Sequence, residues 1–486
     1  MDLQAVLSET DLSKKISLLQ KGRDQEAVEL SAITDALDIK GHDVNNPSKR
    51  PDKPVKLTKT RADGSTYEID DIQKVNRVAL DLQSLVVERA VAFLFGNEVK
   101  VNCDDENLLT AINRVNKDNK IDSFNRQVSR VCFQTTEVAE YWYVKDAESN
   151  DKYGFKASKK IKCSIFSPLK GDSLYPFLDD YGDMTAFSRA FKLKDNDGKT
   201  VEMFETWTDD NYYRWKKSGQ GWIEDANQKY PPTIKKIPIV YASQPYVEWY
   251  KVQSLIDRIE KLLSNFAETN DYFASPKLFI QGADDITISP KDTQGQIFSA
   301  SSKDTDAKYL AWTQLPEPIK LEAEMLLRFI FSLTQTPDIS FESVKGLGTN
   351  ISGETLKMLF LDAHLKVMNK REIFDAYLTR RYNIIKAMLK VMNTAFTDED
   401  VDTEITPFML NSETATVDNL VAMVSAGIIS KETAVEINPY VIDKIQEMER
   451  LTAESNAALG LDEEQNGNDP TKDPTGDDPT QNQVKD

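Results

Sequence analysis

Two amphipathic helical patterns that enclose a strand-and-turn insert constrain the fold of this chain more than any other feature. Residues 246–273 place apolar side chains such as Val252 and Ile256 on one face, with charged residues away from it. Residues 316–335 form a second helical pattern that opens on a proline, which the first turn of a helix tolerates. Short strands and turns are expected for residues 275–312 between them. Because the two ends of this insert must meet, we expect the helices to run antiparallel and side by side.

Four further regions carry helical patterns. Helical periodicity is present in residues 71–95, in residues 104–131, and over a long stretch from Ser352 to about Asn393. Residues 411–455 predict two or three short helices, one of which starts at Ser430.

Strand patterns lie between these helices and make the predicted fold class α+β. Hairpin turns are expected at Asp63–Gly64 and at Asp197–Gly198, and residues 140–168 contain two more strands. The region from about 50 to 240 therefore combines helices with an antiparallel meander.

The chain is strongly acidic, with a formal net charge of −19 over 486 residues. Residues 456–486 contain eight acidic and two basic residues and three Asp-Pro-Thr triplets, a composition that predicts a disordered tail. The body is also acidic, which argues against a surface that grips nucleic acid, because tight binding comes from Lys and Arg displacing counterions. A protein that DNA slides past is not excluded.

The apolar runs are short. Residues 84–96 and 325–333 are too short and too charged to span a membrane, and no secretory core opens the chain. We therefore expect a soluble protein that is made and used in a cytoplasm.

Few residues are suited to catalysis or metal binding. The two histidines are His42, in a polar loop, and His364, inside a predicted helix, so a histidine-dependent hydrolase is disfavoured. Three cysteines (Cys103, Cys132 and Cys163) lack the spacing of a zinc site or a disulfide framework, and each is expected to be a small buried residue. Residues 195–199 fail the calcium-loop pattern and favour a hairpin turn. We expect no catalytic residues, no metal and no cofactor.

The segment 336–360, "TPDISFESVKGLGTNISGETLKMLF", raises the possibility of a phosphate-binding loop. Its glycines at 346, 348 and 353 match neither of the nucleotide-binding patterns G-x-G-x-x-G and G-x-x-x-x-G-K-[ST]. Glu354, which follows the last glycine, would repel a phosphate. A connection between two helices, with Ser352 capping the second, is the simpler interpretation.

Four separated segments, in the same order along the chain, resemble the portal proteins of tailed bacteriophages, of the type common in long-tailed siphophages. They are "NRVALDLQSLVVERAVAFLFGNEVKV" (76–101), the stretch 237–282 that begins "IPIVYASQPYVEWYKV", the glycine-containing segment 336–360, and "AGIISKETAVEINPYVIDKIQEMERL" (426–451).

The resemblance implies a portal fold with a mixed α/β wing, an antiparallel two-helix stem, a small α/β clip, a long kinked helix and a helical crown. By this resemblance the domains are an N-terminal segment at 1–49, the wing at 50–243 with 337–410, the stem at 244–273 and 316–336, the clip at 274–315, the crown at 411–455 and the acidic tail at 456–486.

The resemblance also implies a function without catalysis. Such proteins form rings of roughly twelve subunits, closed by a heterologous interface. The ring sits at one capsid vertex of the virion, after assembly in the host cytoplasm, and is the channel for double-stranded DNA. Expected partners are further copies of the chain, terminase, the major capsid and scaffolding proteins, and head-completion or adaptor proteins, with no membrane.

Residue roles carried over from the family fall in two groups. The tunnel loop at 338–351 would bring Lys345, Thr349 and Asn350 to the DNA backbone, with mobility from its glycines; its candidate residues are Ser343, Lys345, Gly346, Gly348, Thr349 and Asn350. Basic candidates on the stem, for rings in the channel or for salt bridges between subunits, are Lys251, Arg258, Lys261, Lys320 and Arg328.

Three hypotheses stay open at this point. The stem helices are expected to form the ring contact, which Ile259→Asp would test. The alternatives to a portal are a nucleotide-dependent enzyme that uses the Gly346–Gly353 loop and another oligomeric connector or scaffold of the virion.

Overall fold

The structure is a computed structural model of the chain. The chain forms two compact units, Met1–Met409 and Leu410–Asp486. The described residues are 2–23, 29–61, 63–194, 198–219, 221–225, 234–274, 277–281, 286–288, 298–300, 306–310, 317–338, 358, 360–408, 413–438, 440–441 and 444–458.

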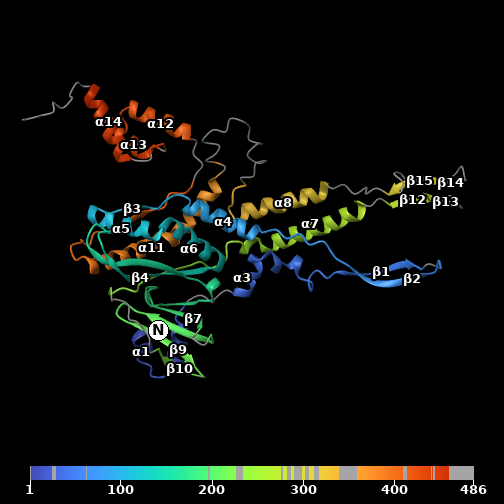
Figure 1. Cartoon of the computed structure of the whole chain (residues 1–486), viewed down its shortest axis with the longest axis horizontal. Coiled ribbons are helices and arrows are strands. Elements are labelled where there is room, and N and C mark those ends of the chain that lie inside the picture. The colour runs from blue at the N-terminus through green and yellow to red at the C-terminus, as the bar shows by residue number, and fades with distance from the viewer. Residues whose placement is uncertain are drawn as a thin grey trace, which may run out of the picture. The chain divides into compact units, whose positions relative to one another are not determined.

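Helices packed on a three-stranded antiparallel sheet form the main core of the first unit (Figure 1). The strand order is β11–β4–β5, and helices α5, α6 and α11 contact these strands while α4 packs on α6 and α11. The elements are α4 (Leu82–Phe95), α5 (Glu106–Asn119), α6 (Ile121–Thr135), α11 (Leu361–Met392), β4 (Glu137–Asn150), β5 (Ala157–Phe166) and β11 (Ile239–Ser243).

A five-stranded antiparallel meander forms the second sheet of this unit, in the order β10–β9–β8–β7–β6. The strands are β6 (Ser173–Leu178), β7 (Met184–Lys194), β8 (Thr200–Trp207), β9 (Tyr212–Ser218) and β10 (Gly221–Glu224). Helices α1 (Leu3–Leu7) and α2 (Leu12–Gln20) bury Val6, Ile16 and Leu19 against it. The predicted hairpin around Gly198 is confirmed, because Lys194 of β7 pairs with Thr200 of β8.

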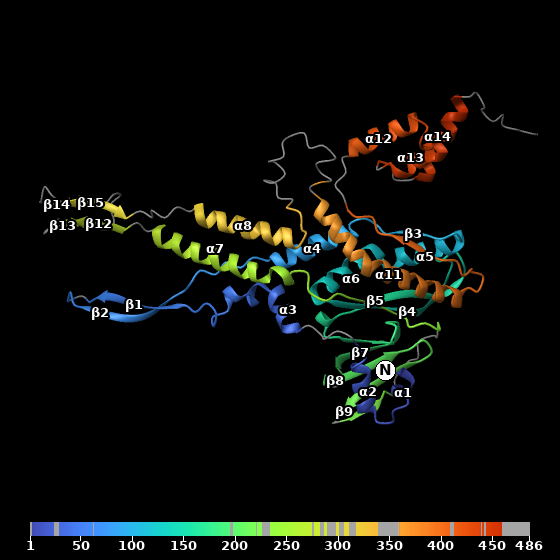
Figure 2. The same ribbon diagram turned by 180° about the vertical axis from the view of Figure 1, so that it is seen from behind.

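The predicted arrangement of helix, insert and helix is confirmed. Helices α7 (Gln253–Ala274) and α8 (Glu317–Leu333) lie side by side in both views (Figures 1 and 2), and Arg258 Nη2 lies 2.6 Å from Glu322 Oε1. The described part of the insert contains two antiparallel strand pairs, which are β12 (Lys277–Gln281) with β15 (Asp306–Leu310) and β13 (Ile286–Ile288) with β14 (Phe298–Ala300).

Near the N-terminus a two-stranded hairpin pairs β1 (Lys53–Thr60) with β2 (Thr66–Gln73), around the turn predicted at Asp63–Gly64. It follows α3 (Leu30–Leu37) and the short 3-10 helices η1 (Ile39–Gly41) and η2 (Asp43–Asn45). A third short pair joins β3 (Lys100–Asn102) to β16 (Asp402–Glu404).

Two helix boundaries differ from the predictions. The helix expected at 71–95 begins only at Leu82, because Asp81 caps it and residues 71–73 belong to β2. The helix expected at 104–131 is two helices, since Lys120 adopts a left-handed backbone with φ 50° that ends α5 before α6 begins.

The long helix predicted at 352–393 is confirmed from Leu361 to Met392, where α11 is helical at every residue. Most of its predicted first part, residues 352–357, lies outside the described residues.

The described part of the second unit contains three short helices, where two or three were predicted. They are α12 (Glu413–Ser425), α13 (Lys431–Ile437) and α14 (Lys444–Ala458). The predicted start at Ser430 is confirmed, because its Oγ accepts a hydrogen bond of 3.1 Å from the Thr433 amide. Among the described residues of both units, no helix is long and apolar enough to cross a membrane.

Candidate functional site

Residues 339–357 of the glycine-rich segment lie outside the described residues, and with them all six candidates placed on it (Ser343, Lys345, Gly346, Gly348, Thr349 and Asn350). The structure does describe the two chain segments that flank it. These are the end of α8 with residues 334–338, and the first turns of α11.

Both flanks are tied to the core by cationic side chains, of which Arg89 is half-buried and Lys366 is buried. Arg89 of α4 donates from Nη1 to the Pro337 carbonyl at 2.6 Å, on the side where the chain leaves α8. On the other side, Lys366 of α11 donates from Nζ to the Thr334 carbonyl at 2.8 Å and lies 2.8 Å from Glu248 Oε1. The two ends of the glycine-rich segment are therefore held at fixed positions on one core.

Glu248 is the buried anion of this cluster. Burial alone would raise the pKa of its carboxyl, but the charges of Lys366 and Lys370 outweigh burial and hold the pKa below its ordinary value. Lys370 Nζ lies 2.7 Å from Glu248 Oε2, so two turns of α11 contact one carboxylate. An ion pair of this kind resists separation, because removing one partner leaves the other charged and desolvated.

Sequence reasoning missed Arg89, Glu248 and Lys366. One feature of the sequence could have revealed Lys366. It lies next to Val367 on the apolar face of a predicted helix, and a charged side chain that faces the core needs a buried partner of opposite charge.

The five basic candidates divide by their surroundings. Lys251, Lys261 and Arg328 are exposed on η4 (Tyr250–Val252), α7 and α8 respectively. Arg258 is bonded to Glu322, and Lys320 lies 3.8 Å from Glu324 one helical turn away. The structure therefore does not bring the five together into one cluster of charge.

An apolar ridge runs along the outer face of α8 at four-residue intervals. The inner face of α8 buries Leu326 and Ile330. The exposed residues that form the ridge on its outer face are Leu321, Met325, Phe329 and Leu333. Residues four apart lie on one side of a helix, so these side chains form a continuous surface. We call this surface the α8 ridge.

Ile259, the position chosen to test the ring contact, is buried within its own chain at 1% exposure. A charge there would disrupt the core and not only an interface. Phe329, which is 48% exposed, is the better test position.

Two of the three cysteines are poorly suited to catalysis. Cys132 is buried, which raises the pKa of its thiol to about 12, and burial raises that of Cys163 to about 12 as well, so their reactive thiolates are suppressed. In the described part of the chain, no group of three or more His, Cys, Asp or Glu side chains could hold a metal ion.

His42 is buried and not part of an open polar loop, in contrast to the prediction. Its Nδ1 lies 2.7 Å from Glu260 Oε1 of α7, and its Nε2 lies 3.1 Å from the Ala36 carbonyl. The same Glu260 oxygen accepts the Leu80 amide at 2.8 Å. This histidine therefore joins the N-terminal segment to α7 and has a structural role.

The His42–Glu260 pair predicts a pH dependence of stability. The hydrogen bond from His42 to Glu260 raises the pKa of the imidazole above its ordinary value. The folded chain then retains a proton that the unfolded chain loses above about pH 6.5, so the free energy of unfolding should fall as pH rises through the raised pKa. The slope should be at most about 1.4 kcal/mol per pH unit.

Urea unfolding of the wild type and of His42→Gln across pH 6 to 9 would measure this contribution as the difference between the two proteins. Parallel curves across that range would contradict it.

Comparisons with known proteins find similarity over most of the chain. A family model described as "Phage portal protein, SPP1 Gp6-like" matches residues 23–460. The chain is similar to a protein named "Portal protein" from Bacillus phage SPP1, with 22% identity over 411 residues, 80% of this chain and 78% of that protein. A chain from a structure titled "Virion of native gene transfer agent (GTA) particle" aligns at 11% identity with a TM-score of 0.38, covering 78% of this chain and 88% of that one.

Proposed function

Because the chain belongs to the SPP1 Gp6-like family of phage portal proteins, we propose that it forms a ring of about twelve copies at one capsid vertex, through which double-stranded DNA passes during packaging and ejection. Its family membership makes it a portal protein of the phage virion. The ring would also be the docking site for terminase and for head-completion proteins. In this proposal the chain carries no enzymatic activity of its own.

The observation that carries the proposal is the α8 ridge on a chain of this family. Its exposed side chains form an apolar surface along one helix, and a soluble protein normally covers such a surface with a partner. In a closed ring each copy contacts the next through the same pair of different surfaces, so the apolar surface is covered in every copy.

The proposed domains follow the elements of the structure. The stem is α7 and α8, the clip is the insert that holds β12–β15, and the crown is α12 to α14. The wing comprises the two sheets with the helices that cover them.

Acidity supports passage of DNA without tight binding. With about twelve copies at −19 each, the ring would carry on the order of −230 charges. A wall of that sign repels phosphates, so counterion-release binding does not develop. We propose that Lys251, Lys261 and Arg328 interrupt this wall sparsely, and that Arg258 and Lys320 are engaged by acidic neighbours of their own chain.

We propose that residues 338–351 are the tunnel loop. The described residues on either side support this role, because Pro337 is bonded by Arg89 and Thr334 by Lys366. We propose that Ser343, Lys345, Thr349 and Asn350 face the passing DNA backbone, with Gly346 and Gly348 supplying the freedom.

Negative-stain microscopy of the purified chain should show rings with a central hole. Given rings, replacing Gly346 and Gly348 by proline should lower the amount of DNA packaged in a reconstituted system several-fold, because the loop can no longer adapt to the moving duplex.

The matched control keeps the ring and replaces the exposed Tyr181, on the turn between β6 and β7, by serine. A wild-type protein without rings would overturn the proposed function, and normal packaging by the proline variant in intact rings would overturn the role of the loop.

A further inference from the structure

A cleft of about 990 Å³ lies between the two larger sheets of the first unit. One wall consists of β4, β5 and the loop after β5, and the other consists of β7, β8 and β9. Both views show the meander on the side of β4 that faces away from α5 and α6 (Figures 1 and 2). A cleft of this volume can take a ligand or a short peptide segment, and the proposed function assigns nothing to it.

Two buried carboxylates that line the cleft are engaged within the chain. Arg189 of β7 donates to Asp172 Oδ1 from Nε and Nη2, at 2.9 and 2.7 Å, and the Ser167 amide donates to Oδ2 at 2.8 Å. Glu205 accepts from Arg189 Nη1 at 3.0 Å and from the Tyr212 hydroxyl at 2.7 Å, one on each oxygen. Every oxygen of the two carboxylates therefore has a partner, and this network gives the cleft a preformed shape.

The lining of the cleft is net positive, with five basic and three acidic side chains. Among the described residues, Lys170 in the loop after β5 bonds only the Ile165 carbonyl, at 3.2 Å, and Lys192 of β7 makes no hydrogen bond or ion pair. Glu202, opposite Lys192 in the strand register, is bonded by Lys217. In a chain with a net charge of −19, two lysines without anionic partners on opposite walls make this cleft a local site of attraction for anions.

Aromatic rings form the apolar part of the cleft. Tyr141 and Tyr143 of β4 stack at a centroid distance of 5.4 Å, and Tyr141 stacks on Phe166 at 5.6 Å. Phe166 in turn stacks on the buried Trp207 at 5.8 Å. The two tyrosines are half-buried, so each still offers part of a ring to a ligand. Burial raises the pKa of Tyr141 to about 12, which keeps its hydroxyl protonated at neutral pH.

These features favour an acidic peptide as the occupant. Its carboxylates would pair with Lys170 and Lys192, and its apolar side chains would lie on the two tyrosines. Asp146 and Lys159, which also line the cleft, lie opposite each other in the register of β4 and β5 and offset each other's charge. A nucleic acid is less well matched, because its tight binding requires many cations and the chain as a whole repels phosphates.

We propose that this cleft binds an acidic peptide segment of a partner protein, with Lys170 and Lys192 pairing with its carboxylates and with Tyr141 and Tyr143 packing on its apolar side chains. The inference goes beyond the proposed ring and is independent of it, because all the residues of the cleft belong to one chain. Its failure would therefore leave the proposed function untouched.

The first test selects the ligand without assuming its sequence. A library of random peptides displayed on ribosomes is selected against the full-length wild type and, in parallel, against the double variant Lys170→Glu, Lys192→Glu. Peptides enriched by the wild type should be acidic and contain apolar residues, and the double variant should not enrich them. Enrichment of neutral or basic peptides, enrichment of the same peptides by both proteins, or no enrichment at all would overturn the proposal.

The second test measures one enriched peptide, synthesised with a fluorophore, by fluorescence anisotropy. Lys192→Glu should raise its Kd at least about tenfold, because attraction becomes repulsion. Lys194→Glu is the matched control, since it makes the same charge change on the same strand at an exposed lysine that does not line the cleft. It should leave the Kd within about twofold of the wild type. Equal Kd values for the two variants would place the binding outside the cleft and overturn the site.

Salt separates the charged contacts from the aromatic ones. The effect of Lys192→Glu should shrink as NaCl is raised, because salt screens exposed charges. Tyr143→Ala should raise the Kd several-fold at every salt concentration, and Tyr143→Phe, which keeps the ring, should bind like the wild type. Wild-type affinity in a folded Tyr143→Ala protein would remove the tyrosines from the site.

Far-UV circular dichroism and thermal unfolding show whether each variant is folded, and a single-stranded oligonucleotide of the same net charge as the peptide serves as competitor. The oligonucleotide should displace the peptide only at concentrations well above the Kd of the peptide. Displacement at lower concentrations would identify a nucleic-acid site and overturn the proposal.

Discussion

Replacing Glu140 by glutamine should destabilise the first unit by about 3–5 kcal/mol, because it breaks a buried ion pair. Glu140 of β4 is fully buried and accepts two hydrogen bonds of 2.8 Å from Arg381 of α11, one on each carboxylate oxygen. It also accepts the Trp142 indole N–H at 2.8 Å, while Asn125 accepts a further bond from Arg381. The amide would leave the guanidinium charged and unpaired in the core.

A double-mutant cycle separates the pair from its surroundings. Glu140→Leu alone and Arg381→Met alone should each be costly, because each leaves the other charge desolvated, whereas the two combined remove both charges and should recover much of the loss. Urea unfolding followed by far-UV circular dichroism measures all four proteins. A Glu140→Gln protein within about 1 kcal/mol of the wild type would show that the pair contributes little.

Replacing Phe329 by aspartate should abolish ring formation while the single chain stays folded. Phe329 lies near the middle of the α8 ridge, between Met325 and Leu333. If the ridge is the contact between neighbours, every interface in the ring acquires a desolvated carboxylate, and the cost is repeated at each one. The wild-type side chain is already half exposed, so the folded monomer loses little.

Phe329→Leu provides the matched control, since it keeps an apolar side chain at the same position. Light scattering should find Phe329→Asp as monomers and Phe329→Leu as rings, and far-UV circular dichroism should show both variants folded. Rings of Phe329→Asp would show that the α8 ridge faces solvent in the assembly.

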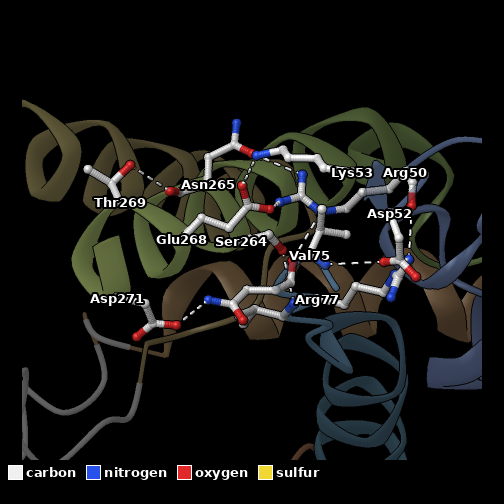
Figure 3. A network of polar contacts seen from close by, with 12 residues as sticks. Arg50, Asp52, Lys53, Val75, Arg77, Ser264, Asn265, Glu268, Thr269 and Asp271 are labelled. Atoms are coloured by element: carbon white, nitrogen blue, oxygen red, sulfur yellow. Dashed lines mark hydrogen bonds and ion pairs between the residues drawn. The ribbon is translucent and has the colours of Figure 1, made fainter. Parts of the chain in front are cut away.

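The two boundary errors in the sequence predictions have different physical causes. Val75 and Val78 fit a helical spacing, but their amides are bonded by distant partners, Asp52 for Val75 (Figure 3) and Ser264 for Val78. Tertiary hydrogen bonds thus hold this segment out of the helix ahead of α4, and no local sequence pattern predicts them. At Lys120 an apolar periodicity that continues across the break concealed a left-handed residue.

The elements predicted correctly were those whose cause is local. The turn at Asp63–Gly64, the cap at Ser430 and the apolar faces of α7 and α8 each depend on residues within a few positions. The anchors around the glycine-rich segment could not be predicted in this way. Lys366 meets Glu248 from far away in the chain, and Arg89 meets a backbone carbonyl that has no signature of its own.

Helix α11 has a mechanical consequence. Near the start of α11, Lys366 donates a hydrogen bond to the Thr334 carbonyl, beside the glycine-rich segment. Fifteen residues later, Arg381 is bonded to Glu140 of the sheet. The two fixed points are roughly 22 Å apart along one unbroken helix. If DNA passes through the proposed ring, a force on the chain at Thr334 is transmitted through Lys366 and along α11 to the sheet that holds Arg381.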